Sequence, residues 1–321
     1  MLAIQAVRAG GPEVLEAIDL PVPTPGPGQI LVRHQAVGLN FIDTYHRSGL
    51  YPMPMPAVLG LEAAGIVEAL GEGVTRFGLG DRVAYNGSLG AYSQAATVAA
   101  DRAVKVPLDV SLEIAAAVLL KGMTAEFLVR RCFHVKPGDV VLIHAAAGGV
   151  GSILVQWCKA LGATVIATVG SEDKAVIARR LGADCVVLYG EEDVAARVAE
   201  ITSGQGVAVV YDGVGKDTFQ ASLKSLARRG MLATFGNASG AVPPFSPLEL
   251  SGKSLFVTRP RLFDYIVTTE DLDESAEALF AVLASGAVKI DIDQTFPLSE
   301  ARAAHEALEG RRTTGATLLL P

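Results

Sequence analysis

Residues 140–151 read Val-Val-Leu-Ile-His-Ala-Ala-Ala-Gly-Gly-Val-Gly and join an apolar run to a helical stretch through a turn with almost no side chains. Such a turn exposes the free N–H groups and the positive dipole end of a helix, which together favour an anion such as a diphosphate. In the G-x-G-x-x-G pattern the glycine positions fall on Ala146, Gly148 and Gly151, so the first glycine is missing. The succession of strand, turn, helix and strand over residues 140–169 is nevertheless the unit that binds dinucleotides. We therefore predict a dinucleotide site, the alternative being a turn that only brings a helix close to a sheet.

The residues after the second strand of this unit indicate which dinucleotide is bound. In NAD sites a carboxylate at the end of that strand, about twenty residues after the glycine turn, accepts the ribose hydroxyls. This chain has Gly170–Ser171 there, with Lys174 one helical turn further on and Tyr189 at the end of the next strand. Lys174 can neutralise a 2′-phosphate, and the two hydroxyl groups can hydrogen-bond to it. NADPH is thus predicted over NADH, provided that Glu172 and Asp173 face solvent.

The chain that positions these residues alternates between strand and helix patterns after residue 124. Strands are expected at 140–144, 164–169, 185–188, 207–211, 230–235 and 254–258, and helices at 150–161, 173–181, 192–201 and 217–227. This alternation predicts an α/β fold with a doubly wound parallel sheet.

The first third of the chain has a different pattern, because short apolar runs between turns predict a β-rich domain. Its strands are expected at 3–7, 16–20, 30–37, 65–70, 82–85 and 91–98. From Ser111 the period becomes helical and continues to Lys121-Gly-Met-Thr124, where we place the domain boundary. Amphipathic helices are expected at 271–284 and 299–308 in a tail that returns to the first domain. The predicted domains are therefore 1–124 with 262–321, and 125–261.

Length and charge narrow the class of protein. A chain of 321 residues can form two domains with their own cores, and a hydrophobic content of 50% suits a sheet that is buried on both faces. The formal net charge of −7 argues against a general affinity for nucleic acid or for an anionic membrane. No basic segment with an apolar core opens the chain, and no apolar stretch approaches ~18 residues. We expect a soluble cytoplasmic protein without a membrane partner.

The residues that usually bind zinc are scarce in the first domain. The three cysteines, Cys132, Cys158 and Cys185, have no metal or disulfide spacing, and His34 and His46 are the histidines before residue 124. Because zinc takes tetrahedral sets of thiolate and imidazole ligands, no metal site is predicted.

Six segments of the chain carry the pattern of a known family. They are Asn40-Phe-Ile-Asp-Thr-Tyr45, Arg47-Ser-Gly-Leu-Tyr-Pro52, Gly60-Leu-Glu-Ala-Ala-Gly65, residues 145–151, Phe235-Gly-Asn237 and Val257-Thr-Arg-Pro260. With these segments the chain resembles, over essentially its whole length, the zinc-independent quinone oxidoreductases, which are the ζ-crystallin-like branch of the medium-chain dehydrogenases/reductases. Zinc alcohol dehydrogenases of the same superfamily need a cysteine near Asn40 and a histidine in the Gly60–Glu62 motif, and this chain has neither. Glu62 is expected to remain as a structural acid.

The resemblance implies a Rossmann domain that binds NADPH and a GroES-like catalytic domain. It also implies that Asn40, Tyr45 and Tyr51 border the pocket for the nicotinamide and the quinone. The residues that it assigns to the cofactor are Asn40, Thr124, Gly148, Gly149, Val150, Gly170, Ser171, Lys174, Tyr189, Asn237, Val257, Thr258, Arg259 and Arg311. The family commonly forms homodimers through the edge strands of its dinucleotide-binding domains, here the region of residues 255–258.

The expected reaction is direct hydride transfer from NADPH to a quinone. Placement of the two reactants supplies much of the rate, and Asn40 or a tyrosine hydroxyl is expected to donate a hydrogen bond to the developing oxyanion. Asp43 is expected at most to orient a tyrosine, and the proton can come from water.

Two other functions remain open at this point. An alkenal or enone reductase would deliver the same hydride to a conjugated C=C bond, which requires a proton donor to the neighbouring carbon. Members of the resembled family also serve as lens structural proteins or bind AU-rich RNA. The acidic composition argues against nucleic acid as the main partner.

Overall fold

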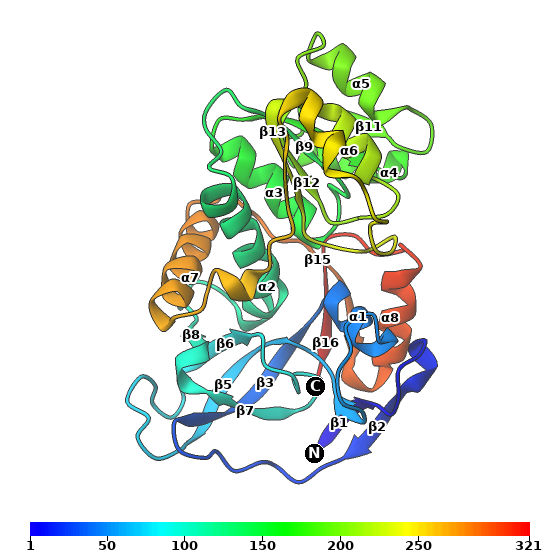
Figure 1. Cartoon of the computed structure of the whole chain (residues 1–321). Helices are drawn as coiled ribbons and strands as arrows, with labels where there is room; N and C mark the ends of the chain where they lie inside the picture. The colour runs from blue at the N-terminus through cyan, green and yellow to red at the C-terminus, as the bar shows by residue number, and fades with distance from the viewer. The chain divides into compact units, whose positions relative to one another are not determined.

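The computed structural model describes residues 1–321 and divides into two compact units (Figure 1). Unit 1 comprises Met1–Met123, Ile266–Ala284 and Ile290–Pro321, and unit 2 comprises Thr124–Tyr265 and Ser285–Lys289. Residues 124, 262–265 and 285–289, which the sequence analysis assigned to the first domain, therefore belong to unit 2. None of the helices is both long enough and apolar enough to cross a bilayer.

Unit 2 is built on a parallel sheet of six strands in the order β11-β10-β9-β12-β13-β14. The strands are β9 (Val140–Ile143), β10 (Thr164–Val169), β11 (Cys185–Leu188), β12 (Val207–Asp212), β13 (Leu226–Thr234) and β14 (Phe256–Thr258). The helices are α3 (Gly149–Ala160), α4 (Glu172–Arg180), α5 (Val194–Ile201) and α6 (Phe219–Ser225). The strand order reverses between β9 and β12, which is the point where doubly wound sheets bind ligands. The predicted α/β fold is confirmed.

The central strands of unit 2 have no solvent-exposed face. Val141, Leu142, Ile143, Val165 and Ile166 are all completely buried. A sheet covered on both faces requires such continuous apolar runs, which explains why these strands were visible in the sequence.

The α6–β13 segment differs from its prediction, which placed a helix at 217–227 and a strand at 230–235. The helix ends at Ser225, and Leu226 already pairs with Val207 in the sheet. A register shift between Val207 and Val209 accommodates the additional strand residues. A bulge of this kind depends on the neighbouring strand, so a local pattern does not reveal it.

Unit 1 contains a seven-stranded and a three-stranded sheet. The larger sheet has the order β15-β16-β3-β5-β6-β8, and β7 also pairs with β3; the smaller sheet has the order β2-β1-β4. The strands are β1 (Leu2–Ala6), β2 (Leu15–Asp19), β3 (Gln29–Leu39), β4 (Ala57–Val58), β5 (Glu62–Leu70), β6 (Arg82–Asn86), β7 (Ala95–Ala99), β8 (Ala103–Lys105), β15 (Ile292–Pro297) and β16 (Ala316–Leu320). The remaining helices are α1 (Phe41–Ser48), α2 (Leu112–Phe127), α7 (Thr269–Ala284) and α8 (Ala301–Glu309).

The C-terminal tail is an integral part of unit 1. Strand β16 pairs antiparallel with β3 and parallel with β15, so residues near the two chain ends share one sheet (Figure 1). Strands β15 and β16 were not predicted, because their pairing partners lie far away in the sequence.

Two further differences from the sequence prediction affect the candidate site. Residues 41–48 form α1, where no helix was expected, and the helix ends at Gly49 in the left-handed conformation with φ 81°. The strand predicted at 91–98 begins only at Ala95, because the backbone of Tyr92 instead bonds to Leu59 and Ile4.

Candidate cofactor and substrate site

The glycine turn of unit 2 leaves the start of α3 open to a ligand. Gly148 is the N-cap of α3, and no side chain caps the helix. Gly148, Gly149 and Val150 are only half-buried. Since the first N–H groups of a helix have no acceptor within it, this end offers backbone donors to an anion.

The close approach of strand and helix depends on Gly151. A Cβ atom at this position would lie 2.2 Å from the backbone oxygen of Ala145. Ala145 itself adopts the left-handed conformation, with φ 52°. Ala146 has no positive φ, and its N–H donates to the oxygen of Thr168, 3.1 Å away. The missing first glycine of the pattern is therefore tolerated, because Ala146 adopts a conformation that any residue can take.

A buried polar network supports the strand ends next to this turn. His144, which follows β9, contacts the Thr168 hydroxyl through Nδ1 at 2.8 Å and the Ser222 hydroxyl through Nε2 at 3.0 Å. The Ser222 hydroxyl also donates to Asp212 Oδ2, 3.1 Å away, and Asp212 accepts N–H groups of the loop after β12. Burial lowers the pKa of His144. His144 therefore acts as a neutral scaffold residue.

The residues at the carboxyl end of β10 have the composition expected of a site that binds a 2′-phosphate. A Cβ atom on Gly170 would lie 2.4 Å from the Tyr189 hydroxyl, so that hydroxyl lies directly over the glycine. Ser171 is the N-cap of α4 and accepts the Lys174 N–H. The Glu172 carboxylate pairs with Arg179 on the exposed side of α4.

The other residues assigned to the cofactor lie at several places. In unit 2, Val257 and Thr258 belong to β14, and the Arg259 guanidinium donates to the oxygen of Gly236 at 2.9 Å, next to Asn237. Thr124 is buried within α2. Arg311 is exposed in unit 1, just after α8.

In unit 1, Asn40 is held between two buried carboxylates. Its side-chain Nδ2 donates to Glu62 Oε2 at 2.9 Å, and its backbone N–H donates to Asp43 Oδ2 at 2.9 Å. Glu62 is completely buried and also accepts the Lys121 ammonium at 3.2 Å and the Leu120 N–H at 2.6 Å.

This arrangement changes the role expected for Asn40. Its amide group is already donating to Glu62 and, at 3.4 Å, to the oxygen of Gly38. Asn40 or a tyrosine was expected to donate to the substrate, and this geometry favours a tyrosine. Glu62 was expected only as a structural acid, and Lys121 had no predicted role, because an acidic and a basic residue without a zinc-ligand pattern give no further signal in the sequence.

Tyr45, on α1, lies next to Tyr51, in the loop after the helix. Their ring centroids are 5.3 Å apart in an edge-to-face arrangement, and the Tyr51 N–H donates to the Tyr45 oxygen at 3.0 Å. Phe41 lies 6.4 Å from the Tyr45 ring. Asn40 directly precedes this short helix, Tyr45 lies on it, and Tyr51 lies in the loop that follows it. An aromatic surface of this kind suits a flat, weakly polar substrate.

No group of three or more His, Cys, Asp and Glu side chains is placed to hold a metal ion. The polar groups around Asn40 are two carboxylates, its own amide and one ammonium, a set without the thiolate or imidazole ligands that zinc takes.

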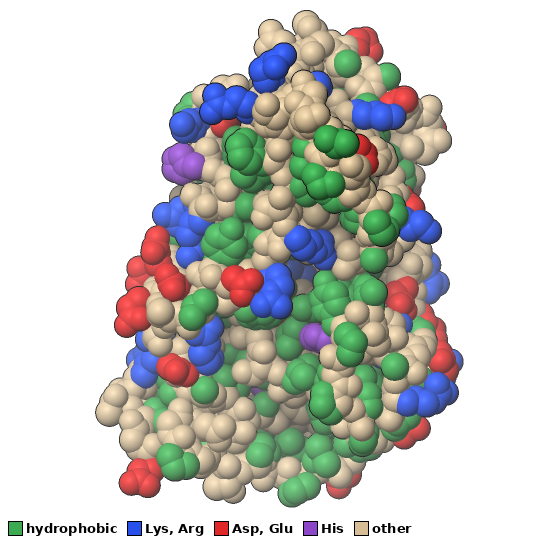
Figure 2. All heavy atoms as spheres, viewed as in Figure 1, with side chains coloured by type: hydrophobic (Ala, Val, Ile, Leu, Met, Phe, Trp, Pro, Cys, Tyr) green, Lys and Arg blue, Asp and Glu red, His purple; other side chains and the backbone are tan.

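Charged side chains of both signs are interspersed over the face in Figure 2. No extended basic surface is visible on that face.

Comparisons with known proteins agree with this architecture. Residues 26–108 match the alcohol dehydrogenase GroES-like domain, and residues 149–282 match the zinc-binding dehydrogenase domain. A GroES-like unit combined with a dinucleotide-binding unit defines the medium-chain dehydrogenases/reductases.

The relatives give the family within that class. The quinone oxidoreductase of Pseudomonas aeruginosa is 51% identical over 99% of both chains. A crystal structure of Escherichia coli quinone oxidoreductase complexed with NADPH is 49% identical, with a TM-score of 0.98 and full coverage of both chains. A 2-haloacrylate reductase from a Burkholderia species is 47% identical over 98% of this chain and 97% of its own. The chain belongs to the quinone oxidoreductase family, as the sequence motifs indicated.

Proposed function

We propose that this protein transfers a hydride from NADPH to a quinone. The open glycine turn at α3, in a chain about half identical to quinone oxidoreductases over its full length, carries this proposal. The relative solved with NADPH supports the choice of cofactor. The end of β10 agrees with it, because Gly170 and Ser171 directly follow that strand and the Glu172 carboxylate pairs with Arg179.

The residues of unit 2 fit NADPH by their chemistry. Gly148, Gly149 and Val150 would hold the diphosphate with backbone N–H groups. Ser171, Lys174 and Tyr189 would hold the 2′-phosphate through one charge and two hydroxyls. The assigned residues Thr124, Gly170, Asn237, Val257, Thr258, Arg259 and Arg311 complete the proposed cofactor set. When bound, NADPH supplies the hydride.

The residues of unit 1 would hold the quinone. Tyr45 and Tyr51 would bind the ring and donate a hydrogen bond to the oxygen that becomes negative, while Asn40 would border the pocket from its fixed position between Glu62 and Asp43. Placement of the reactants can lower the barrier by roughly 7 to 11 kcal/mol. Water can supply the proton after hydride transfer, so no general acid is required.

The quinone site is tested by following NADPH oxidation with a benzoquinone. Loss of an oxyanion donor costs about 2.7 to 4 kcal/mol, so Tyr51→Phe should lower kcat by roughly a hundredfold or more. Asn40→Ala should also reduce kcat/KM. Tyr265→Phe, which removes a tyrosine hydroxyl in unit 2, is the control and should keep wild-type activity. Wild-type kcat/KM in both Tyr51→Phe and Asn40→Ala would refute the assigned pocket.

The cofactor assignment is tested with Lys174→Ala. The Kd for NADPH, measured by calorimetry, should rise about tenfold or more while the weaker Kd for NADH stays constant, because only NADPH has the 2′-phosphate. An equal loss for both cofactors would contradict the role of Lys174.

Reduction of a conjugated C=C bond is the second candidate, because a relative at 47% identity is named 2-haloacrylate reductase. Turnover of 2-chloroacrylate faster than turnover of a benzoquinone would favour it. The quinone is preferred here, since the relatives at 50 and 51% identity are named for it.

We also propose that the protein is a cytoplasmic homodimer. Strand β14 is at the edge of the unit 2 sheet, and Phe256 on it is 55% exposed. An exposed edge strand with an apolar residue suits pairing with a second copy. The three free cysteines suit a reducing compartment. Light scattering should give a dimer mass for the wild type and a monomer mass for Phe256→Asp; a monomeric wild type would refute the dimer.

A further inference from the structure

Helix α1 is tied to the rest of unit 1 by a ring of four buried polar side chains, which is closed through the helix backbone between Asp43 and Arg47. Asp43 and Arg47 lie one turn apart on α1, so both are on the same side of the helix. Tyr92, in the turn before β7, and His305, on α8, connect them: the Tyr92 hydroxyl lies 3.1 Å from Asp43 Oδ2 and 2.9 Å from His305 Nε2, and His305 Nδ1 lies 3.0 Å from Arg47. All four side chains are nearly or completely buried.

The direction of each hydrogen bond follows from chemistry. Arg47 can only donate, so His305 Nδ1 is the acceptor and Nε2 carries the hydrogen. His305 Nε2–H then donates to the Tyr92 oxygen, and the Tyr92 O–H donates to Asp43. Burial and the neighbouring Arg47 lower the pKa of His305 to about 3, which keeps the imidazole neutral, as this pattern requires.

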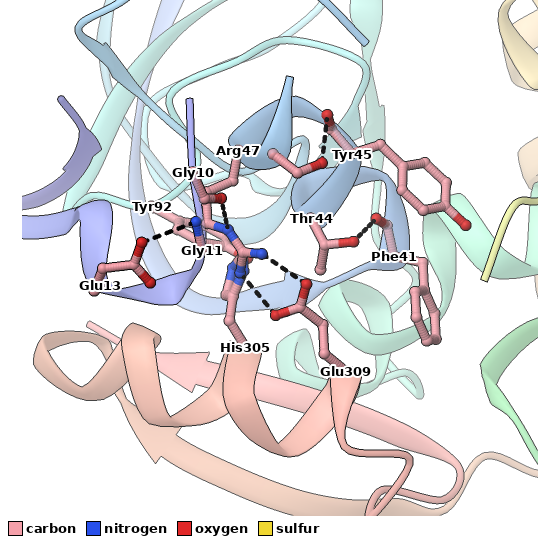
Figure 3. Close-up of polar contacts among 11 residues, drawn as sticks. Gly10, Gly11, Glu13, Phe41, Thr44, Tyr45, Arg47, Tyr92, His305 and Glu309 are labelled. Carbon is pink, nitrogen blue, oxygen red and sulfur yellow. Dashed lines mark hydrogen bonds and ion pairs between the residues drawn. The ribbon is translucent and has the colours of Figure 1, made fainter. Parts of the chain in front are cut away.

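Arg47 also joins α1 to two distant segments (Figure 3). Its guanidinium pairs with Glu309 on α8 at 2.6 Å and donates to the oxygen of Gly10 at 3.1 Å. The Gly10 N–H donates back to the Arg47 oxygen at 3.0 Å. Because Arg47 is only 1% exposed, its charge needs these partners, and they hold the end of α1 in place.

The opposite side of α1 carries Tyr45, one of the proposed quinone residues. Phe41 and Tyr45 are also one turn apart, and Figure 3 shows their rings pointing away from Arg47 and His305. At the start of the helix, Asp43 accepts the Asn40 backbone N–H through the same oxygen that accepts Tyr92. The ring therefore fixes the side of α1 that carries Asp43 and Arg47, together with the N-cap residue Asn40. The opposite side of the helix carries the aromatic side chains.

We propose that Tyr92 and His305 are positioning residues, which hold α1 so that Asn40 and Tyr45 are placed for the quinone. This proposal rests on the proposed function. Tyr92 acts through its hydrogen bond to Asp43, and His305 acts through its hydrogen bond to Arg47.

The protonation of Asp43 should link this ring to pH. Burial raises the pKa of Asp43 to about 7. The groups that face it are the Tyr92 hydroxyl, the Asn40 N–H and Lys121, which favour the carboxylate, and Glu62, which opposes it. The neutral His305 and the paired Arg47 lie beyond Tyr92. Tyr92 and Asn40 both donate to Oδ2, and Oδ1 has no partner, so a proton on Oδ1 would keep both hydrogen bonds but remove the negative charge that strengthens them. The kcat/KM for the quinone should therefore fall as pH drops through about 7.

The experiment compares Tyr92→Phe with Tyr85→Phe. Tyr85 provides a matched control, because its buried hydroxyl also bonds to a buried histidine, His34 at 3.0 Å, but is not connected to α1. Tyr92→Phe should lower kcat/KM for a benzoquinone about tenfold and move the acid limb of the pH profile to higher pH, since a donor to the Asp43 carboxylate is lost. Tyr85→Phe should cost stability without moving that limb.

Hydrogen exchange gives a readout that does not depend on activity. In Tyr92→Phe the amides of residues 40–48 should exchange faster, and in Tyr85→Phe they should not. For His305, Gln can still accept from Arg47 and donate to Tyr92, so His305→Gln should retain more quinone activity than His305→Leu.

Each failure has a distinct result. A wild-type protein that does not reduce quinones refutes the proposed function, whereas the exchange of residues 40–48 still tests the ring. An active wild type together with an unchanged pH profile and unchanged exchange in Tyr92→Phe overturns the positioning proposal alone. Equal effects of Tyr85→Phe and Tyr92→Phe on the pH limb would also overturn it.

Discussion

The two units present their candidate binding groups in different ways. Unit 2 presents main-chain N–H groups at Gly148–Val150, where side chains are nearly absent. Unit 1 presents the side chains of Asn40, Tyr45 and Tyr51, and holds them with buried charges such as Glu62 and Arg47. A site built from main-chain N–H groups must be free of side chains that would block the ligand, whereas a site built from side chains needs neighbouring groups that hold those side chains in place.

This difference determines which substitutions each unit tolerates. In unit 2 the glycine turn should not tolerate a larger residue, because an added methyl group would collide with backbone at the turn. In unit 1 the buried charged side chains should not tolerate removal, because loss of one partner leaves the other charge buried and uncompensated.

The largest effect is expected from Glu62→Gln. This change leaves the Lys121 ammonium buried without its carboxylate, and breaking a buried pair costs about 3 to 5 kcal/mol of unfolding free energy. Urea unfolding would measure the loss. Glu62→Gln with Lys121→Met should recover much of it. Arg302→Ala, which breaks an exposed ion pair with Glu306, should cost only about 0.5 kcal/mol. A similar small loss for Glu62→Gln would contradict the importance of the buried charge.

A smaller effect is expected from Gly151→Ala in unit 2. The added Cβ would lie 2.2 Å from the Ala145 oxygen. The backbone shift that removes such a clash lowers the free energy of unfolding by about 1 to 3 kcal/mol. Affinity for NADPH should fall as well, because α3 has to move away from the turn. Gly190→Ala is the control, since no heavy atom lies within 4 Å of its Cβ position. If both variants unfold at the same urea concentration, the close contact is unimportant.

The third effect is a loss of stability in acid, and it should distinguish the buried His34 from the exposed His134. Burial lowers the pKa of His34 to about 4, and its Nδ1 lies 2.7 Å from the Ser93 oxygen. The folded state therefore binds this proton more weakly than the unfolded state, so the stabilisation is present above pH 6.5 and is lost as pH falls toward 4. His34 should account for about 2 kcal/mol of the stability lost between pH 7 and pH 5.

Urea unfolding at the two pH values would check this. The difference should shrink by that amount in His34→Gln and should stay the same in His134→Gln, where the histidine is exposed. An unchanged difference in His34→Gln would show that His34 titrates normally.

The sequence was most informative about unit 2. Strands such as Thr164–Val169 and Cys185–Leu188 were predicted at the observed residues, because a fully covered sheet requires unbroken apolar runs. The glycine turn was also recognisable, since its function resides in local backbone geometry. Helix boundaries differed by one or two residues, as for α3, which begins at Gly149.

Unit 1 was less predictable because its elements depend on distant partners. Helix α1 has only eight residues, and its stability comes from Tyr92 and from His305 and Glu309 on α8, more than 200 residues away from Arg47. Short helices need such tertiary contacts. The tail strands β15 and β16 were missed for the same reason.

The amino-acid sequence alone determined the family, the dinucleotide topology and the residues available for chemistry, because these depend on local composition and spacing. Only the tertiary structure decided that Asn40 donates to Glu62, that Ala146 can replace a glycine, and that Tyr92 and His305 connect Asp43 to Arg47 on one side of α1. Burial and pairing of polar side chains are set by residues far apart in the chain, and folding must bring them together before their roles are defined.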